Sequence, residues 1–351
     1  MPKLWGREFS KDDLISRLGD LSQIASALPC EFADGNERGC KFVLIRNAAG
    51  LELTVLTDRG MSIYDLSLRG VPLAFKTAVG PVHPSYCSAK GLDWLSSWPA
   101  GLLTPCGLAN VGSPCVDEAG EAGLHGRISS IAARNVSSGA RWTPEGNYEL
   151  FVEGTVTETS FFGTNLCLHR RISTLIDESR FWIEDWVENR GFEAAPLMFL
   201  QHINLGFPLI DAGSRLLLPA CITIPRDAEA QAGIGEWMCF SGPKQSYREQ
   251  VFYHDCQPDA EDRVRATVIN PEFENGTGIG LYIQYKKNEY PNLVQWKMMK
   301  QGTYVCGIEP ANCHVAGRCE ERKRGTLVML ASGERRSFTM EMGVFRGSPA
   351  Q

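Results

Sequence analysis

The chain has no long hydrophobic run, no block of basic residues and only six histidines. Its 351 residues carry 35 Lys+Arg against 41 Asp+Glu, which gives a formal net charge of −6. This mildly acidic balance argues against nucleic acid or an anionic membrane as a partner. The longest uncharged stretch, residues 94–116, contains three prolines and three glycines, so it cannot form a regular spanning helix. Because the N-terminus also lacks an apolar leader, we expect a cytoplasmic protein.

Several familiar catalytic signatures are missing as well. There is no Gly-x-Gly-x-x-Gly, phosphate loop, Gly-x-Ser-x-Gly or His-Glu-x-x-His, which argues against nucleotide-dependent chemistry, serine hydrolysis and zinc proteolysis. Twelve cysteines are present, but none form a Cys-x-x-Cys, and the spacing of Cys306, Cys313, His314 and Cys319 matches no zinc site. We therefore expect reduced thiols and no metal.

Short β-rich segments follow one another with few helical intervals. Residues 148–157 alternate between an apolar face and a mostly polar one, as a half-buried strand does. Ser10 is an N-cap candidate for a short helix. The remaining predicted strands are 42–46, 51–56, 166–175, 181–187, 197–205, 214–224, 279–285, 293–297, 326–330 and 337–344. This succession predicts an antiparallel β-sandwich with less than about one-fifth helix. We expect an N-terminal arm over residues 1–35 and a single domain over residues 36–351.

Two histidines are candidates for chemistry. His202 and Asn204 point to the same face of a predicted strand, while Ile203 points to the other. The alternative is an ordinary half-exposed strand. His125 lies between glycines in Gly123-Leu-His-Gly-Arg127, where the backbone can approach a ligand closely, although it could equally be a turn histidine.

Glu309 is the only acid between Glu289 and Glu320. If it is buried in its apolar strand, its pKa rises, which suits a general base near neutral pH. The alternative is a structural salt bridge, for example with Arg318. Arg59 and Lys297 end apolar strands and are further candidates, although simple exposure would also explain them.

The order of these motifs resembles the aldose 1-epimerase (galactose mutarotase-like) superfamily, and more closely its DUF4432 branch. The resemblance covers residues 40–345. It rests on Asp58-Arg-Gly60, Gly80-Pro-Val-His-Pro84, the 101–112 segment, Leu124-His-Gly-Arg127, Trp186-Val-Glu-Asn-Arg-Gly191, His202-Ile-Asn-Leu205 and Gly307-Ile-Glu309.

The resemblance implies an all-β antiparallel β-supersandwich with a sugar-sized cleft. It implies His202 as general acid and Glu309 as general base in the opening and closing of a sugar ring, with no cofactor. His125 and Arg127 would contact substrate, and Arg59, Asn204 and Lys297 are expected in the same cleft. Mutarotases also hold sugar hydroxyls with an aspartate, for which Asp211 and Asp255 are candidates here.

The function expected is a sugar mutarotase, or 1-epimerase. Two alternatives remain open at this point. One is an isomerase, epimerase or lyase acting on an acidic or keto sugar, which a cluster of Arg59, Arg127 and Lys297 would favour. The other is a non-catalytic carbohydrate-binding protein on the same fold. The expected partner is a small-molecule sugar, and the chain could also form a homodimer.

Overall fold

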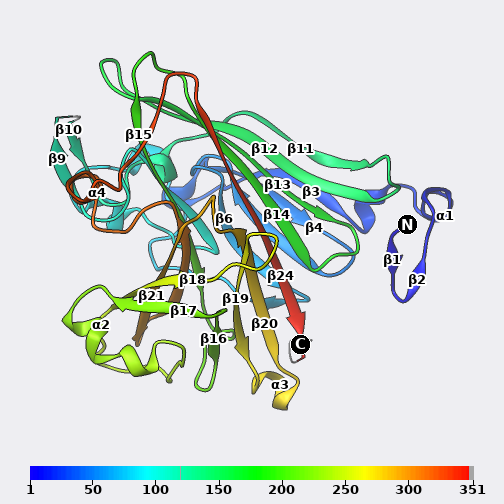
Figure 1. Ribbon diagram of the computed structural model, residues 1–351. Helices are drawn as coiled ribbons and strands as arrows, with labels where there is room; N and C mark the ends of the chain where they lie inside the picture. Colours follow the sequence, from blue (N-terminus) through cyan, green and yellow to red (C-terminus); the bar gives the residue numbers. More distant parts are fainter. Residues whose placement is uncertain (119, 348–351) are drawn as a thin grey trace.

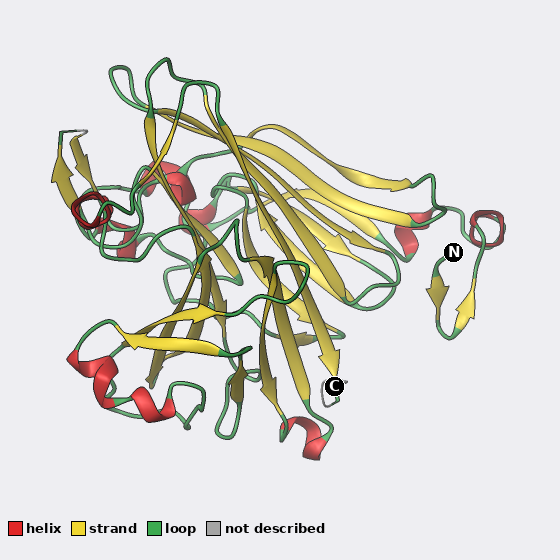
Figure 2. Cartoon of the chain, viewed as in Figure 1, coloured by secondary structure: helices red, strands yellow, loops and turns green. Residues whose placement is uncertain are grey.

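The computed structural model describes residues 1–118 and 120–347. Strands account for 49% of the chain and helices for 12%, so the predicted all-β class with little helix is confirmed. Every pair of named strands among the described residues is antiparallel. Figure 2 shows the few helices as short segments around a body of strands.

The larger sheet has twelve strands, and neighbours in the following list are hydrogen-bonded to each other. The path is β17 (Cys221–Pro225), β18 (Gln250–Cys256), β21 (Asn292–Lys300), β22 (Thr303–Ala311), β15 (Ala195–Leu205), β8 (Leu103–Leu108), β6 (Ser62–Leu68), β5 (Leu51–Leu56), β4 (Lys41–Arg46) and β3 (Ser26–Glu31). Two short strands add to it, β7 (Val71–Pro72) beside β6 and β23 (Val328–Leu330) beside β15.

The second sheet has eight strands. Its order is β11 (Arg134–Trp142), β12 (Tyr148–Thr159), β13 (Asn165–Leu175), β14 (Arg180–Asn189), β24 (Arg335–Arg346), β20 (Ile279–Lys286), β19 (Arg263–Asn270) and β16 (Arg215–Leu217). The C-terminal strand β24 lies between β14 and β20, far from either in sequence, and is the red arrow in Figure 1.

Small elements complete the chain. They are the hairpins β1 (Lys3–Leu4) with β2 (Arg7–Glu8) and β9 (Cys115–Asp117) with β10 (Gly120–Ala122), and the helices α1 (Lys11–Ile15), α2 (Ala228–Ala232), α3 (Phe273–Gly276) and α4 (Arg318–Arg324). Within the described residues there are also six single-turn 3₁₀ helices, including η4 (Asp93–Ser96). No helix in the described part of the chain is long and apolar enough to cross a membrane.

The main hydrophobic core is made of residues from both sheets. β12 alternates as predicted, with Leu150, Val152, Gly154 and Val156 buried and the odd-numbered residues between them partly exposed. Ile203 and Ile308 of the larger sheet belong to the same core. The core therefore uses one face of each sheet, as in a sandwich.

The opposite face of the larger sheet carries a second, smaller core, and this face holds the site. β15 is buried along its whole length. Phe199 and Ile203 belong to the main core, whereas Met198 and Leu200 pack in the second cluster with Trp94 and other residues. Loops rather than a third sheet cover this second face, which allows a cavity to form there.

Two predicted boundaries differ from the structure. The larger sheet already begins at Ser26. Its first strand, β3, lies within residues 1–35, the segment expected to be an arm, and pairs with β4 of the domain. The predicted strand 214–224 is two strands, since β16 joins the smaller sheet and β17 the larger one. Pro219, which has no backbone N–H to give to a ladder, lies between them. The predicted N-cap of α1 is confirmed, since the Asp13 amide donates to Ser10 Oγ.

Candidate active site

His202 is fixed by its neighbour on the same face of β15. Its Nδ1 lies 2.6 Å from Asn204 Oδ1. The Asn204 amide donates to the carbonyls of Gly101 and His202, which orients its oxygen toward the ring. An amide oxygen only accepts hydrogen bonds, so Nδ1 carries the proton and Nε2 of the neutral ring is left free for chemistry.

Glu309 lies directly across from His202 on the neighbouring strand β22. The register pairs Ile203 with Ile308 and Leu200 with Ala311, so positions 202 and 309 face each other. Glu309 Oε1 is 3.3 Å from His202 Nε2, and the two residues are only 2% and 5% exposed. Gly307 makes room for this carboxylate, because a Cβ there would lie 2.4 Å from Oε1.

The buried carboxylate has unused hydrogen-bonding capacity. Although the 3.3 Å contact is within ion-pair distance, Glu309 Oε1 has no hydrogen-bond partner within the described residues. A buried polar atom without a partner is costly, and such atoms are concentrated at functional sites. The suggested salt bridge to Arg318 is wrong, because Arg318 pairs with Asp117 instead.

Burial decides how the pair carries its charge. Desolvation lowers the pKa of His202 to about 4, and it raises the pKa of Glu309 well above its usual value. Both effects disfavour the charged form of each group. At neutral pH the two groups therefore hold one proton between them, and the pair has no net charge.

His125 completes the chemical cluster from a loop far away in sequence. Its backbone has a φ of 57°, and its ring lies 5.4 Å from that of His202, measured between centroids. The backbone nitrogen of Gly112 lies 3.4 Å from His125 Nδ1 and donates a hydrogen bond to it. Because Nδ1 accepts, the proton of the neutral ring is on Nε2, which can donate to a ligand. Burial lowers the pKa of His125 to about 3, so the ring is neutral. The predicted convergence of His125, His202 and Glu309 is therefore what the structure shows.

Three tryptophans form the walls of the cavity that these residues share, whose volume is about 300 Å³. Trp94 and Trp98 stack with ring centroids 4.6 Å apart, and Trp296 lies 5.9 Å from Trp98. Each indole N–H already has a partner in the protein. These partners are Ser129 Oγ for Trp94, Thr104 Oγ1 for Trp98 and Glu249 Oε2 for Trp296. The indoles therefore offer a ligand only their carbon faces.

An ion pair lines another part of the same cavity. Arg226 Nη2 donates to Glu249 Oε1 at 2.9 Å, while Trp296 donates to the other carboxylate oxygen at 2.9 Å. Arg226 also binds Asp227. Val251 and Val294 also line the cavity, and in the register Val294 is opposite Glu309 while Val251 is opposite Trp296. The single positive charge of Arg226 is thus offset within the protein by Glu249 and Asp227.

The structure places Arg59 away from the cavity, contrary to the prediction. It is 1% exposed, and its guanidinium donates to the carbonyls of Val82, Ser97 and Ser129. It therefore ties together the loops behind the site. The sequence could not reveal this, because an arginine satisfied by backbone carbonyls needs no charged partner nearby in sequence.

Arg127 and Lys297 are also outside the cavity lining, and Asn204 reaches it only through His202. Arg127 is partly exposed, pairs with Glu158 at 3.7 Å and donates to the Thr159 carbonyl. Lys297 donates to the carbonyls of Glu236 and Cys239, on the face of β21 opposite Trp296. Strand alternation itself indicated this, since Trp296 and Lys297 are consecutive.

The aspartate candidates do not line the cavity either. Asp255 pairs with Lys287, and Asp211 belongs to a turn closed by Ser214. Besides Glu309, the cavity is lined by a second acid, Glu249, which the sequence analysis did not predict. Glu249 comes directly before β18 and lies outside every predicted strand, and no local pattern separates it from the exposed charges around it.

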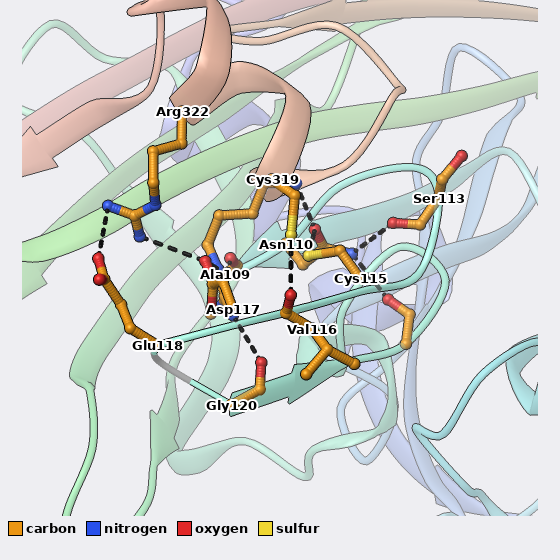
Figure 3. Close-up of polar contacts among 12 residues, drawn as sticks. Ala109, Asn110, Ser113, Cys115, Val116, Asp117, Glu118, Gly120, Cys319 and Arg322 are labelled. Atoms are coloured by element: carbon orange, nitrogen blue, oxygen red, sulfur yellow. Dashed lines mark hydrogen bonds and ion pairs between the residues drawn. The ribbon is translucent and has the colours of Figure 1, made fainter.

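A hairpin anchored to α4 supports the wall behind His125. Arg318 holds Asp117 through two hydrogen bonds of 2.7 and 2.9 Å, and its backbone N–H donates to Asn110 Oδ1. Figure 3 shows Asn110 turned toward Ser113, with Arg322 reaching Glu118 on the hairpin. Because residue 112 donates to His125, this anchoring fixes the wall against which that ring rests.

A second hollow, of about 510 Å³, is less suited to catalysis. It is wide open and lined largely by exposed side chains, including Lys244, Arg248 and Lys300. No buried acid–base pair lines it among the described residues. We therefore take the smaller cavity as the candidate active site.

The comparisons with known proteins agree with this architecture. The family described as "Domain of unknown function (DUF4432)" matches residues 37–344. The chain belongs to this family. No curated protein matches it.

Three solved structures show the shared fold. A protein from Klebsiella pneumoniae, provisionally named an aldose 1-epimerase, is 24% identical with a TM-score of 0.87, covering 97% of this chain and 87% of the other. A galactose mutarotase-like protein from Clostridium acetobutylicum is 15% identical (TM-score 0.59, 92% and 99% covered). A galactose 1-epimerase from Lactobacillus acidophilus is 12% identical (TM-score 0.53, 92% and 99% covered). The resemblance to the galactose mutarotase-like fold is thus confirmed, and at these identities it concerns the fold alone.

Proposed function

We propose that this member of the DUF4432 family is a sugar 1-epimerase, or mutarotase, that interconverts the anomers of a neutral reducing sugar. The observation that carries the proposal is the facing pair of His202 and Glu309, buried at 3.3 Å in an aromatic cavity with His125 beside it. Such a pair can remove one proton and supply another at the same centre, as anomer exchange requires.

The reaction proceeds by ring opening. Glu309 takes the proton from the anomeric hydroxyl while protonated His202 donates to the ring oxygen, which leaves an open-chain carbonyl. After rotation about the C1–C2 bond, Glu309 returns its proton to the carbonyl oxygen and His202 recovers its own as the ring closes on the other face. The pair holds one proton before and after, so the site needs no exchange with solvent and no cofactor.

Two further groups are suited to hold the substrate. His125 Nε2 presents a donor near the reacting atoms. Arg226 and Glu249 provide a donor and an acceptor side by side, which suits neighbouring hydroxyls of a sugar. Because Arg226 is already paired with Glu249 and Asp227, these residues favour a neutral ligand over an anion.

The acidic-sugar alternative lacks the cation cluster on which it depended. Arg59, Arg127 and Lys297 lie outside the cavity lining and are bound to other groups. A carboxylate or phosphate would have to displace Glu249 or Asp227 from Arg226. We therefore propose a neutral sugar, rather than an acidic one, as the substrate.

The test is two-dimensional exchange NMR with purified protein and a panel of neutral aldoses, ketoses and uronic acids. We expect exchange between the α and β anomeric signals to be faster than the buffer rate for neutral aldoses, without deuterium uptake at carbon. A protein that binds a reducing sugar without accelerating its exchange would be a binding protein. Deuterium incorporation at C2 would instead indicate an isomerase.

A further inference from the structure

The surroundings of His202 restrict what can be attached next to the sugar's ring oxygen. This inference rests on the proposed function, in which His202 Nε2 meets the ring oxygen and Glu309 meets the anomeric centre. The ring oxygen of an aldopyranose is bonded to C1 and C5 only. The group carried by C5 must therefore extend away from Glu309 and lie close to the His202 ring.

That region is aromatic on several sides. Ring centroids of Trp98, Trp296 and Trp94 lie 5.0, 5.7 and 6.2 Å from that of His202. All three indole N–H groups are engaged within the protein, as described above. A substituent there meets carbon surfaces.

Two polar groups close to His202 are available, His125 Nε2 and Glu309, and in the proposed complex they bind the anomeric and neighbouring ring hydroxyls. The remaining polar groups there are occupied within the protein. Thr104 Oγ1 donates to the Ala100 carbonyl, and both donor hydrogens of the Asn204 amide go to backbone carbonyls. Arg226 and Glu249 bind each other, and Glu249 also accepts the Trp296 indole N–H. With His125 and Glu309 engaged by the ring hydroxyls, a hydroxyl on the C5 substituent would be desolvated without a free partner, and a carboxylate or phosphate would be buried without a free cation.

We propose that the cavity selects a 6-deoxyhexose, whose C5 substituent is a methyl group, over the parent hexose with a hydroxymethyl group. The methyl packs against the indole faces around His202. The hydroxyls on the other ring carbons bond to His125, Arg226 and Glu249. An apolar pocket rejects an added hydroxyl only modestly, so the preference should be about 10- to 100-fold in kcat/KM.

The test uses matched pairs of sugars that differ only at C6. These are L-fucose with L-galactose, L-rhamnose with L-mannose, and 6-deoxy-D-glucose with D-glucose, all followed by exchange NMR. We expect the 6-deoxy member of the preferred pair to have the higher kcat/KM, and glucuronate to show no acceleration. Equal kcat/KM values for the two sugars of a pair, or a higher value for the hexose, would overturn the proposed preference for 6-deoxy sugars without contradicting the epimerase function. No acceleration of any sugar would overturn both.

A pair of variants tests the role of the indole surface. Trp98→Gln introduces a free amide beside the expected methyl, and it should bring the kcat/KM ratio of deoxy sugar to hexose close to one. Trp98→Phe removes the indole N–H but keeps an aromatic face, so the ratio should remain above one. If both variants retain the wild-type ratio, Trp98 does not contact the C5 substituent. Should Trp98→Gln fail to fold, the matched sugars with wild-type protein still decide the question.

Discussion

Glu309 lies in an environment that opposes its ionisation, yet the proposed reaction needs it as a base. The conflict is resolved by the 3.3 Å contact with His202 Nε2, because a proton that moves from Glu309 to His202 creates both the base and the acid in one step. A bound sugar hydroxyl can also fill the unused capacity of Oε1. The two residues therefore act as one proton-holding unit, and single substitutions should affect them jointly.

Glu309→Gln tests the base directly. The amide keeps the shape of the side chain but cannot take a proton, so anomer exchange should fall about 100-fold or more while sugar binding persists. The matched control is Glu249→Gln at the other end of the cavity, which should mainly raise KM. Exchange NMR and a titration with the same sugar separate the two effects. An equal loss of kcat in both variants would contradict the assignment.

Asn204 acts through His202 as a positioning residue. Asn204→Ala removes the acceptor that holds the proton on Nδ1, so Nε2 is no longer reserved for the substrate and kcat should fall about tenfold or more with little change in KM. Asn204→Asp keeps an acceptor and adds a negative charge, which raises the pKa of His202 above its present value of about 4. The acid limb of the pH–kcat profile should therefore move to higher pH in Asn204→Asp. A structural role alone would leave this limb in place.

At the level of elements, three adjacent strands bring the site together. β15 supplies His202, β22 supplies Glu309 and β21 supplies Trp296, all on the face of the larger sheet that the second core covers. The antiparallel register places residues from distant parts of the sequence opposite each other without help from loops. The geometry of the pair also depends on the absence of a side chain at Gly307, beside the Glu309 carboxylate.

Gly307→Ala tests this dependence. The added methyl would lie 2.4 Å from Glu309 Oε1 and 3.1 Å from Trp296 Cβ, so the carboxylate must turn away from His202. We expect kcat to fall at least tenfold. The control is Gly242→Ala, where a Cβ would meet nothing within 4 Å. Exchange kinetics and thermal unfolding of both variants check the result, and unchanged kcat in Gly307→Ala would show that the carboxylate does not need this position.

On the scale of the whole molecule, alternation and motif order were sufficient to predict the fold class and the meeting of His125, His202 and Glu309. They were insufficient where a role depends on which loop lies over which strand. Arg59 and Lys297 are surrounded by backbone carbonyls from distant loops, and Glu249 reaches the cavity from the edge of β18. Contacts between segments that are far apart in the sequence produce no local sequence pattern. Trp94 and Trp98 were missed for the same reason, since they lie in and just after the 3₁₀ helix η4, in a segment without strand periodicity.

Buried histidines also give the fold a predictable dependence on pH. Burial lowers the pKa of His254 to about 4 from an ordinary value of 6.5, while its two ring nitrogens bond to Thr223 and Gln295. The unfolded chain takes up a proton on this residue below pH 6.5, and the folded chain does so only near pH 4. The unfolded state therefore binds more protons within this window, and acidification lowers the free energy of unfolding. His202 adds to this loss with the same sign. Glu309 opposes it, because its raised pKa lets the folded state hold the extra proton.

His254→Gln isolates one contribution, because His254 does not line the cavity and bonds to neither member of the catalytic pair. Urea unfolding at intervals between pH 7 and pH 4 should show that the variant loses less stability on acidification than wild type, by on the order of 3 kcal/mol over the full window. The control is Thr223→Val, which removes one hydrogen bond to the ring but leaves it titratable. This variant should be less stable than wild type at pH 7, yet retain most of the wild-type pH slope. A His254→Gln variant with the full wild-type slope would mean that other groups cause the acid sensitivity.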